Sequence, residues 1–115
     1  MRQEETVEPD RVNVINSLAW VKATSSDDKL RDIAEALRLV RKAAELTDHK
    51  QPEILDTYAA ALAANGRFSE AVQACKKALV FVGTLYDKGK ELGEQIKARI
   101  RLYQAHRPYI ETSTE

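Results

Sequence analysis

The sequence predicts an all-helical fold, on the basis of residue composition, hydrophobic spacing and an internal repeat. Sixteen of the 115 residues are alanine, and leucine, glutamate, lysine and arginine supply much of the rest. These are the residue types that favour helices most strongly. Alternation of β-branched and polar residues, the pattern of a half-buried strand, is nearly absent. At this length we expect one domain, and a 43% hydrophobic content with balanced charge indicates a chain that folds.

The first helix is predicted over residues 11–23, after a charged tail at residues 1–9 that we expect to be disordered. Pro9 and Asp10 form its entry, with Asp10 as the N-cap that accepts unpaired amide hydrogens. Apolar residues recur at three- and four-residue steps and should gather on one face that packs on the rest of the fold. They are Val14, Ile15, Leu18, Ala19 and Val21.

The next two helices are predicted over residues 33–46 and 52–64. Residues 24–28 are turn-forming, and Asp32 with Glu35 three positions later resembles a capping box at the start of a helix. Pro52 suits a first helical turn, where its missing amide hydrogen would be unpaired anyway. Asn65 and Gly66 then supply a C-terminal stop.

Two further helices are predicted over residues 68–82 and 88–105. Gly83 and Gly89 flank a weak segment between them. The last helix carries one apolar stripe before Pro108, and residues 107–115 are expected to form a C-terminal tail. The stripe consists of Leu92, Ile96, Ile100 and Tyr103.

The pattern of small residues repeats along the chain. Ala36 and Ala71 are 35 residues apart, and Ala43 and Ala78 have the same separation. Each pair also has similar neighbours in the sequence. A period in this range is typical of arrays of helix–turn–helix units.

This pattern resembles the tetratricopeptide repeat (TPR) family, whose units of 34 residues place small residues where two helices cross closely. The resemblance implies a right-handed α-solenoid at residues 10–106. It would contain one repeat at about residues 12–50, a second at about 52–82, and a capping helix at about 88–105. The alternative is an ordinary helical bundle that uses alanine at close crossings. The residues expected at crossings and turns are Leu18, Ala19, Ala36, Ala43, Tyr58, Ala59, Gly66, Ala71 and Ala78.

The resemblance also implies a concave groove, lined by the first helix of each unit, that holds a peptide or a partner helix. Asparagine side chains can hydrogen-bond a peptide backbone, and Trp20 could be an aromatic anchor. Trp20 could instead pack under the turn at residues 25–31, and both interpretations stay open. The groove residues expected to be exposed are Asn13, Asn16, Trp20, Asp56, Ala60 and Glu94.

The sequence offers little for catalysis, so we predict a non-catalytic protein that needs no cofactor and no metal. His49 and His106 are the two histidines, and neither has a nucleophile or paired carboxylate at a useful spacing. Cys75 falls on the predicted packing stripe of its helix, which favours a buried core residue. The four glycines form no phosphate-binding loop.

We therefore expect the partner to be another protein or peptide. The 18 basic and 18 acidic residues cancel, which argues against nucleic acid, and no apolar run is long enough for direct membrane insertion. A single cysteine favours the cytoplasm or another reducing compartment, unless the chain belongs to a longer anchored protein. A self-association or assembly domain, and hence a homo-oligomer, is the alternative function.

Overall fold

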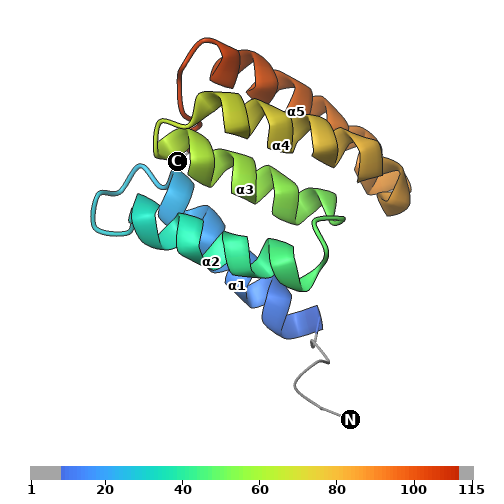
Figure 1. Ribbon diagram of the computed structural model, residues 1–115, viewed down its shortest axis with the longest axis horizontal. Helices are drawn as coiled ribbons and strands as arrows, with labels where there is room; N and C mark the ends of the chain where they lie inside the picture. Colours follow the sequence, from blue (N-terminus) through green and yellow to red (C-terminus); the bar gives the residue numbers. More distant parts are fainter. Residues whose placement is uncertain (1–8, 112–115) are drawn as a thin grey trace.

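The computed structural model describes residues 9–111, and over this range the protein is all-helical, as predicted (Figure 1). Apart from helices, this range holds turns and one isolated bridge between Ser25 and Glu111. The elements are α1 (Pro9–Thr24), α2 (Ile33–Leu46), α3 (Pro52–Ala64), α4 (Phe68–Phe81), the short 3₁₀ helix η2 (Val82–Leu85) and α5 (Asp87–Gln104).

The observed helix bounds match the predicted ones closely. The bounds of α2 and α3 are those predicted, whereas α4 ends at Phe81 and the weak segment after it forms η2. Helix α1 begins at Pro9, so Asp10 lies within the first turn and is not the residue that precedes the helix. Residues 1–8 of the predicted N-terminal tail lie outside the described residues.

Local hydrogen bonds explain where α2 begins and where α3 ends. The carboxylate of Asp32 accepts a hydrogen bond from the backbone N–H of Glu35 at 3.2 Å, which caps the first turn of α2. Gly66 has a φ of 80°, a left-handed conformation that a residue without Cβ adopts easily, and the chain leaves α3 there. The side chain of Asn65 donates to the carbonyl of Ile33 at 2.9 Å and ties the end of α3 to the start of α2.

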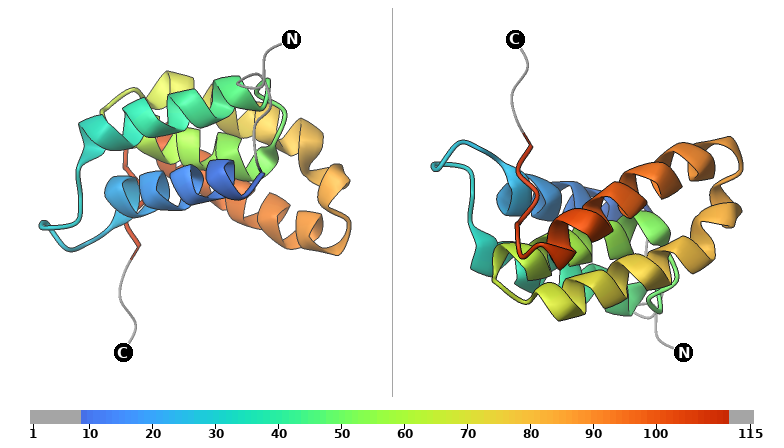
Figure 2. Two further views of the ribbon diagram at one scale, coloured as in Figure 1. Left: turned by 90° about the horizontal axis from the view of Figure 1, so that it is seen from below. Right: turned by 90° about the horizontal axis from the view of Figure 1, so that it is seen from above.

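Each helix packs on the next one in the sequence, α1 also packs on α3, and α3 contacts α5. Figure 2 shows α1 and α5 on one side of the molecule and α2 and α4 on the other, with α3 between them. Ten of the thirteen residues of α3 are buried, as expected for the central helix. Helices α1 and α5 therefore both cover the same side of α3 (Figure 2).

Small residues occupy the close helix contacts. Six of the alanines predicted at crossings are fully buried, with exposed fractions of 0%: Ala19, Ala36, Ala43, Ala59, Ala71 and Ala78. Tyr58 is half-buried, and Gly66 lies exposed in its turn. An alanine lets two helix backbones approach closely, and a larger side chain at such a position would have no room.

The predicted packing face of α1 is wrong for three of its five residues, whereas Ala19 and Ile15 pack on the core as predicted. Val14, Leu18 and Val21 are 65%, 46% and 41% exposed, so Leu18 does not lie at a helix crossing. Helix α1 instead buries Val12, Ala19 and Ala23 against its neighbours, while Ile15 is half-buried. The helix has apolar residues on two faces, and the face with the small residues is the one that can approach α2 and α3 closely.

We predict that Ala71→Leu lowers the free energy of unfolding by about 1–3 kcal/mol, because three added carbon atoms overpack a fully buried site. Ala98→Leu, at an exposed position on α5, is the matched control and should change stability by less than about 0.5 kcal/mol. Urea unfolding followed by circular dichroism measures both. Equal stabilities of the two variants would contradict the close packing at Ala71.

Candidate binding groove

A groove of about 500 Å³ lies between α1, α3 and α5. Helices α1 and α3 provide its polar side chains Asn16, Ser17, Glu53, Asp56 and Thr57, together with Trp20 and Val21. Helix α5 adds Leu92, Gln95 and Arg99, and the segment after α5 adds Tyr109 and Glu111. The site is thus assembled from residues far apart in the sequence.

The structure places only half of the six predicted groove residues at this groove. Asn16 and Trp20 line it and are half-buried. Asp56 also lines it but is only 5% exposed, because α3 is covered by α1 and α5. Ala60 is 1% exposed and lies in the core, so the prediction that Asp56 and Ala60 are exposed is wrong. Asn13 and Glu94 are exposed but are not among the lining residues.

A buried ion pair joins α3 to α5 at the floor of the groove. The guanidinium Nη1 of Arg99 donates to Oδ2 of Asp56 at 2.8 Å, although the two residues are 43 positions apart in the sequence. Arg99 is 9% exposed and Asp56 is 5% exposed. Breaking such a pair by removing one partner is costly, since it leaves an uncompensated charge in the interior.

The surroundings shift the pKa values of both groups. Burial raises the pKa of the Asp56 carboxyl to about 6, and the positive charge of Arg99 opposes this rise. Burial alone would lower the pKa of the Arg99 guanidinium, but the attraction of Asp56 and of the nearby tyrosines outweighs it and raises this pKa. Both groups are therefore charged at neutral pH.

Two aromatic rings cover the Arg99 guanidinium. Its central carbon lies 5.0 Å from the ring centroid of Trp20 and 4.5 Å from that of Tyr109. The two rings are tilted by 39° with centroids 5.7 Å apart. These distances are within the range of cation–π attraction, which contributes about 0.5–2 kcal/mol depending on desolvation.

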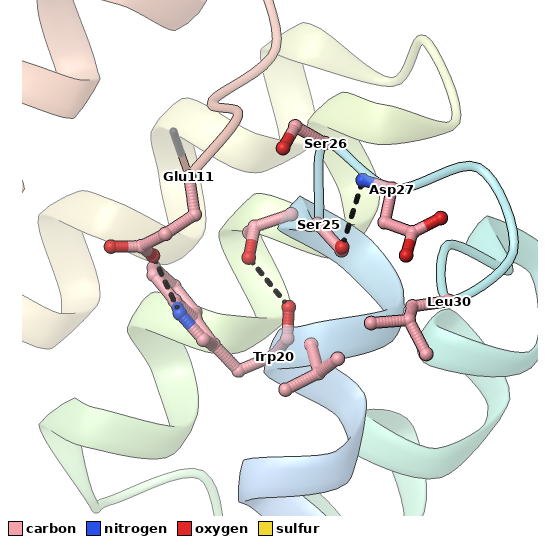
Figure 3. Close-up of a pocket in the computed structure, with 8 residues that line it drawn as sticks. Trp20, Ser25, Ser26, Asp27, Leu30 and Glu111 are labelled. Atoms are coloured by element: carbon pink, nitrogen blue, oxygen red, sulfur yellow. Dashed lines mark hydrogen bonds between the residues drawn. The ribbon is translucent and has the colours of Figure 1, made fainter. Parts of the chain in front are cut away.

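The C-terminal segment, defined here as residues 108–111, crosses the end of the groove. The backbone N–H of Glu111 donates to the carbonyl of Thr24 at 2.7 Å. The indole N–H of Trp20 donates to Oε1 of Glu111 at 2.9 Å (Figure 3). Residues 108–111 of the predicted C-terminal tail therefore pack on the fold, because their side chains contact Trp20 and Arg99. Residues 112–115 lie outside the described residues.

Trp20 also forms the wall of a second hollow, next to the groove. This side hollow has a volume of about 410 Å³ and lies between the end of α1 and the turn that follows it (Figure 3). Its lining includes Val21, Leu30 and Glu111. Trp20 is thus a shared wall of two hollows, and its indole N–H is held by Glu111.

Three buried polar atoms at the groove have no hydrogen-bond partner among the described residues: Oδ1 of Asn16, Oδ1 of Asp56 and Nε of Arg99. Two of the three are acceptors and one is a donor, and all three lie beneath the surface, so they are polar groups that the packing of α1, α3 and α5 leaves unpaired. The hydroxyl of Tyr103, which is buried nearby on α5, is also without a partner in this part of the chain.

Arg99, Tyr109 and Glu111 are the important groove residues that sequence reasoning missed. In the sequence, Arg99 stands between Lys97 and Arg101 near the end of a helix, where basic residues usually complement the helix dipole. Its spacing held a contrary signal, since Arg99 lies three residues after Ile96 and four before Tyr103, both of which are 0% exposed. The positions of Tyr109 and Glu111 had no comparable signal, because they depend on the path of the chain after α5.

Metal ligation, a reactive thiol and a membrane-spanning helix can each be checked between residues 9 and 111. No three histidine, cysteine, aspartate or glutamate side chains of this range converge to hold a metal ion. Cys75 is buried in the core, as predicted, and burial raises the pKa of its thiol to about 12, so it is no thiolate nucleophile at neutral pH. None of the helices in this range combines the length and apolar character needed to cross a bilayer.

Comparison of the chain with protein-family models, with curated proteins and with solved structures gives no match. The groove is therefore interpreted from its own geometry. Its main features are a fixed cation between two aromatic rings and a segment of the chain in which Tyr109 lies over that cation and Glu111 accepts a hydrogen bond from Trp20.

We predict that Asp56→Ala lowers the free energy of unfolding by about 3–5 kcal/mol, because it leaves the Arg99 charge buried without its partner. Glu53→Ala is the matched control, since it removes the same charge from an exposed position one turn earlier on α3. Its cost should stay below about 1 kcal/mol. Guanidinium unfolding measures both, and similar losses in the two variants would argue against the ion pair.

We also predict that the stability of the wild type relative to Asp56→Asn falls as pH rises from about 4 to about 6. In this window the folded protein keeps a proton on Asp56 that the unfolded chain, with an ordinary carboxyl pKa, has already released. The difference should level off near pH 7. Urea unfolding of both proteins at each pH measures it, and a relative gain for the wild type with rising pH would contradict the raised pKa.

Proposed function

We propose that this chain is a non-catalytic protein-interaction module that binds an extended peptide or a partner helix in the groove between α1, α3 and α5. The observation that carries the proposal is the pair of aromatic rings, Trp20 and Tyr109, around the fixed Arg99 guanidinium, with the half-buried Asn16 side chain beside them. Aromatic anchors with nearby hydrogen-bonding groups are common at the centres of protein interfaces.

We further propose that the fold is a right-handed solenoid of two TPR-like helix pairs, α1–α2 and α3–α4, with α5 as the cap. Two observations support this. Ala36 and Ala43 on α2 have the same complete burial as Ala71 and Ala78 on α4, 35 residues later. The helices that line the groove are α1, α3 and α5, which are the first members of each pair and the cap.

The charges of the site suit a protein partner better than a nucleic acid. The groove contains one buried pair of opposite charges, and its rim mixes Glu53, Gln95 and Glu111. A nucleic-acid surface would instead present several cations to the phosphates. The single buried cysteine suits a reducing compartment, so a cytoplasmic setting is part of the proposal.

A second candidate function, self-association, is favoured by a different surface. Val14 and Leu18, which do not line the groove, lie on an apolar stripe of α1 that ends at Val21 on the groove edge, and Leu30 in the following turn is 53% exposed. Contiguous exposed apolar side chains often mark an interface. In this alternative the stripe, and not the groove, makes the contacts.

We predict that Trp20→Ala weakens binding of the groove partner at least about tenfold, the loss expected for an aromatic anchor. The partner is obtained by capture from cell extract on the wild-type chain, and its affinity is then measured by calorimetry. Val80→Ala, which truncates a side chain that is 74% exposed on α4, is the control and should bind like the wild type. Asn16→Ala provides a second groove variant that keeps the packing of Trp20.

The same set of variants, with Leu18→Glu added, distinguishes the two candidate functions. A partner that is retained by Val80→Ala and lost by Trp20→Ala and Asn16→Ala supports the groove. A dimer in sedimentation equilibrium that Leu18→Glu dissociates, with no partner lost by the groove variants, would replace the groove by the α1 stripe.

A further inference from the structure

The C-terminal segment shows which ligand chemistry the groove accepts. We propose that Tyr109 and Glu111 act as a built-in ligand, and that the partner is an extended peptide segment with an aromatic residue followed two positions later by a carboxylate. The incoming segment takes the place of Tyr109 and Glu111. This inference rests on the proposed function of the groove and specifies its partner.

The first part of the ligand is the aromatic ring. Tyr109 lies against Trp20 and over the guanidinium of Arg99, with the two centroid distances of 5.7 and 4.5 Å given above. Arg99 cannot turn toward solvent, because its Nη1 is held by Asp56. Any aromatic ring at this position meets a cation that is already fixed and largely desolvated, which is the arrangement in which cation–π attraction is strongest.

The second part is the carboxylate with its backbone. Glu111 accepts a hydrogen bond from the indole of Trp20, and its own N–H donates to the carbonyl of Thr24. The segment forms a parallel bridge with Ser25 at the end of α1. This combination of one backbone hydrogen bond and side-chain contacts two residues apart is how extended peptides bind to an exposed backbone edge.

The segment is held weakly enough to be exchanged. Of residues 108–111, Tyr109 and Ile110 are only half-buried and Glu111 is exposed. The hydrogen bond between Trp20 and Glu111 is also exposed, so water can take the place of either partner when the segment leaves. The side hollow next to Glu111, with Val21 and Leu30 in its wall, can accept an apolar side chain of an incoming peptide and add contact area.

The test uses the full chain carrying Tyr109→Ala and Glu111→Ala together, and a blocked synthetic peptide that copies residues 107–113, Arg-Pro-Tyr-Ile-Glu-Thr-Ser. Trp20 is the one tryptophan of the chain, so its fluorescence reports occupation of the site directly. We expect the double variant to bind the peptide at least about tenfold more tightly than the wild type, in which the site is occupied most of the time. Peptide binding should also raise the melting temperature of the variant.

Matched controls test each part of the ligand. A peptide with alanine in place of the tyrosine should bind the double variant at least about tenfold more weakly. A peptide with alanine in place of the glutamate loses the acceptor for the Trp20 indole and should bind about two- to tenfold more weakly. The Ile110→Ala chain should behave as the wild type, because the interactions that hold the segment are made by Tyr109 and Glu111. Circular dichroism establishes that each variant folds, and Glu111→Ala alone, which keeps Tyr109 over Arg99, replaces the double variant if that one does not.

The outcomes separate this inference from the proposed function. A folded variant that binds the peptide no better than the wild type overturns the inference. If the partner captured on the wild type still depends on Trp20 in that case, the groove function stands and only the ligand class is wrong. If no captured partner depends on Trp20 and the copied peptide does not bind, both are wrong.

Discussion

The ion pair between Asp56 and Arg99 is the constraint on which the end of the fold depends. A buried guanidinium must be paired, and its carboxylate partner lies on α3, so the ion pair favours the observed register of α5 along α3. The remaining faces of Arg99 are covered by Trp20 from α1 and by Tyr109 from the segment after α5. One charge thus connects three helices and determines the path of the chain at its C-terminal end.

The alanines at the helix contacts limit how much of the groove floor is exposed. With Ala19, Ala59 and Ala71 fully buried, the helices lie close together and α3 is almost covered. The floor of the groove therefore consists of side chains with little exposed surface, and a partner can reach mainly the rim and the two aromatic rings. Affinity would then depend on a few contacts and on how well those contacts are held in place before binding.

Local signals made the helices predictable, whereas the site depends on contacts between distant residues. Asp32, Pro52 and Gly66 mark the bounds of α2 and α3 within a few residues of sequence, and those bounds were predicted correctly. The packing face of α1 was predicted only in part, because periodicity cannot tell which of its two apolar faces meets the core. The partners of Arg99 include Asp56, 43 residues before it on α3, Trp20 on α1, and Tyr109, 10 residues after it, and no pattern within a single helix contains that information.

The role of Asp56 follows from this geometry even though its side chain is almost inaccessible to a partner. By holding Nη1 of Arg99 at 2.8 Å, it fixes the guanidinium in the position that an aromatic ring must meet. An arginine that was free in the groove would lose side-chain entropy of about 1.5–2 kcal/mol when a ligand ordered it. Here folding has already ordered the cation, so the ligand gains the attraction without that cost. A buried carboxylate that touches no ligand can in this way raise the affinity of the groove above it.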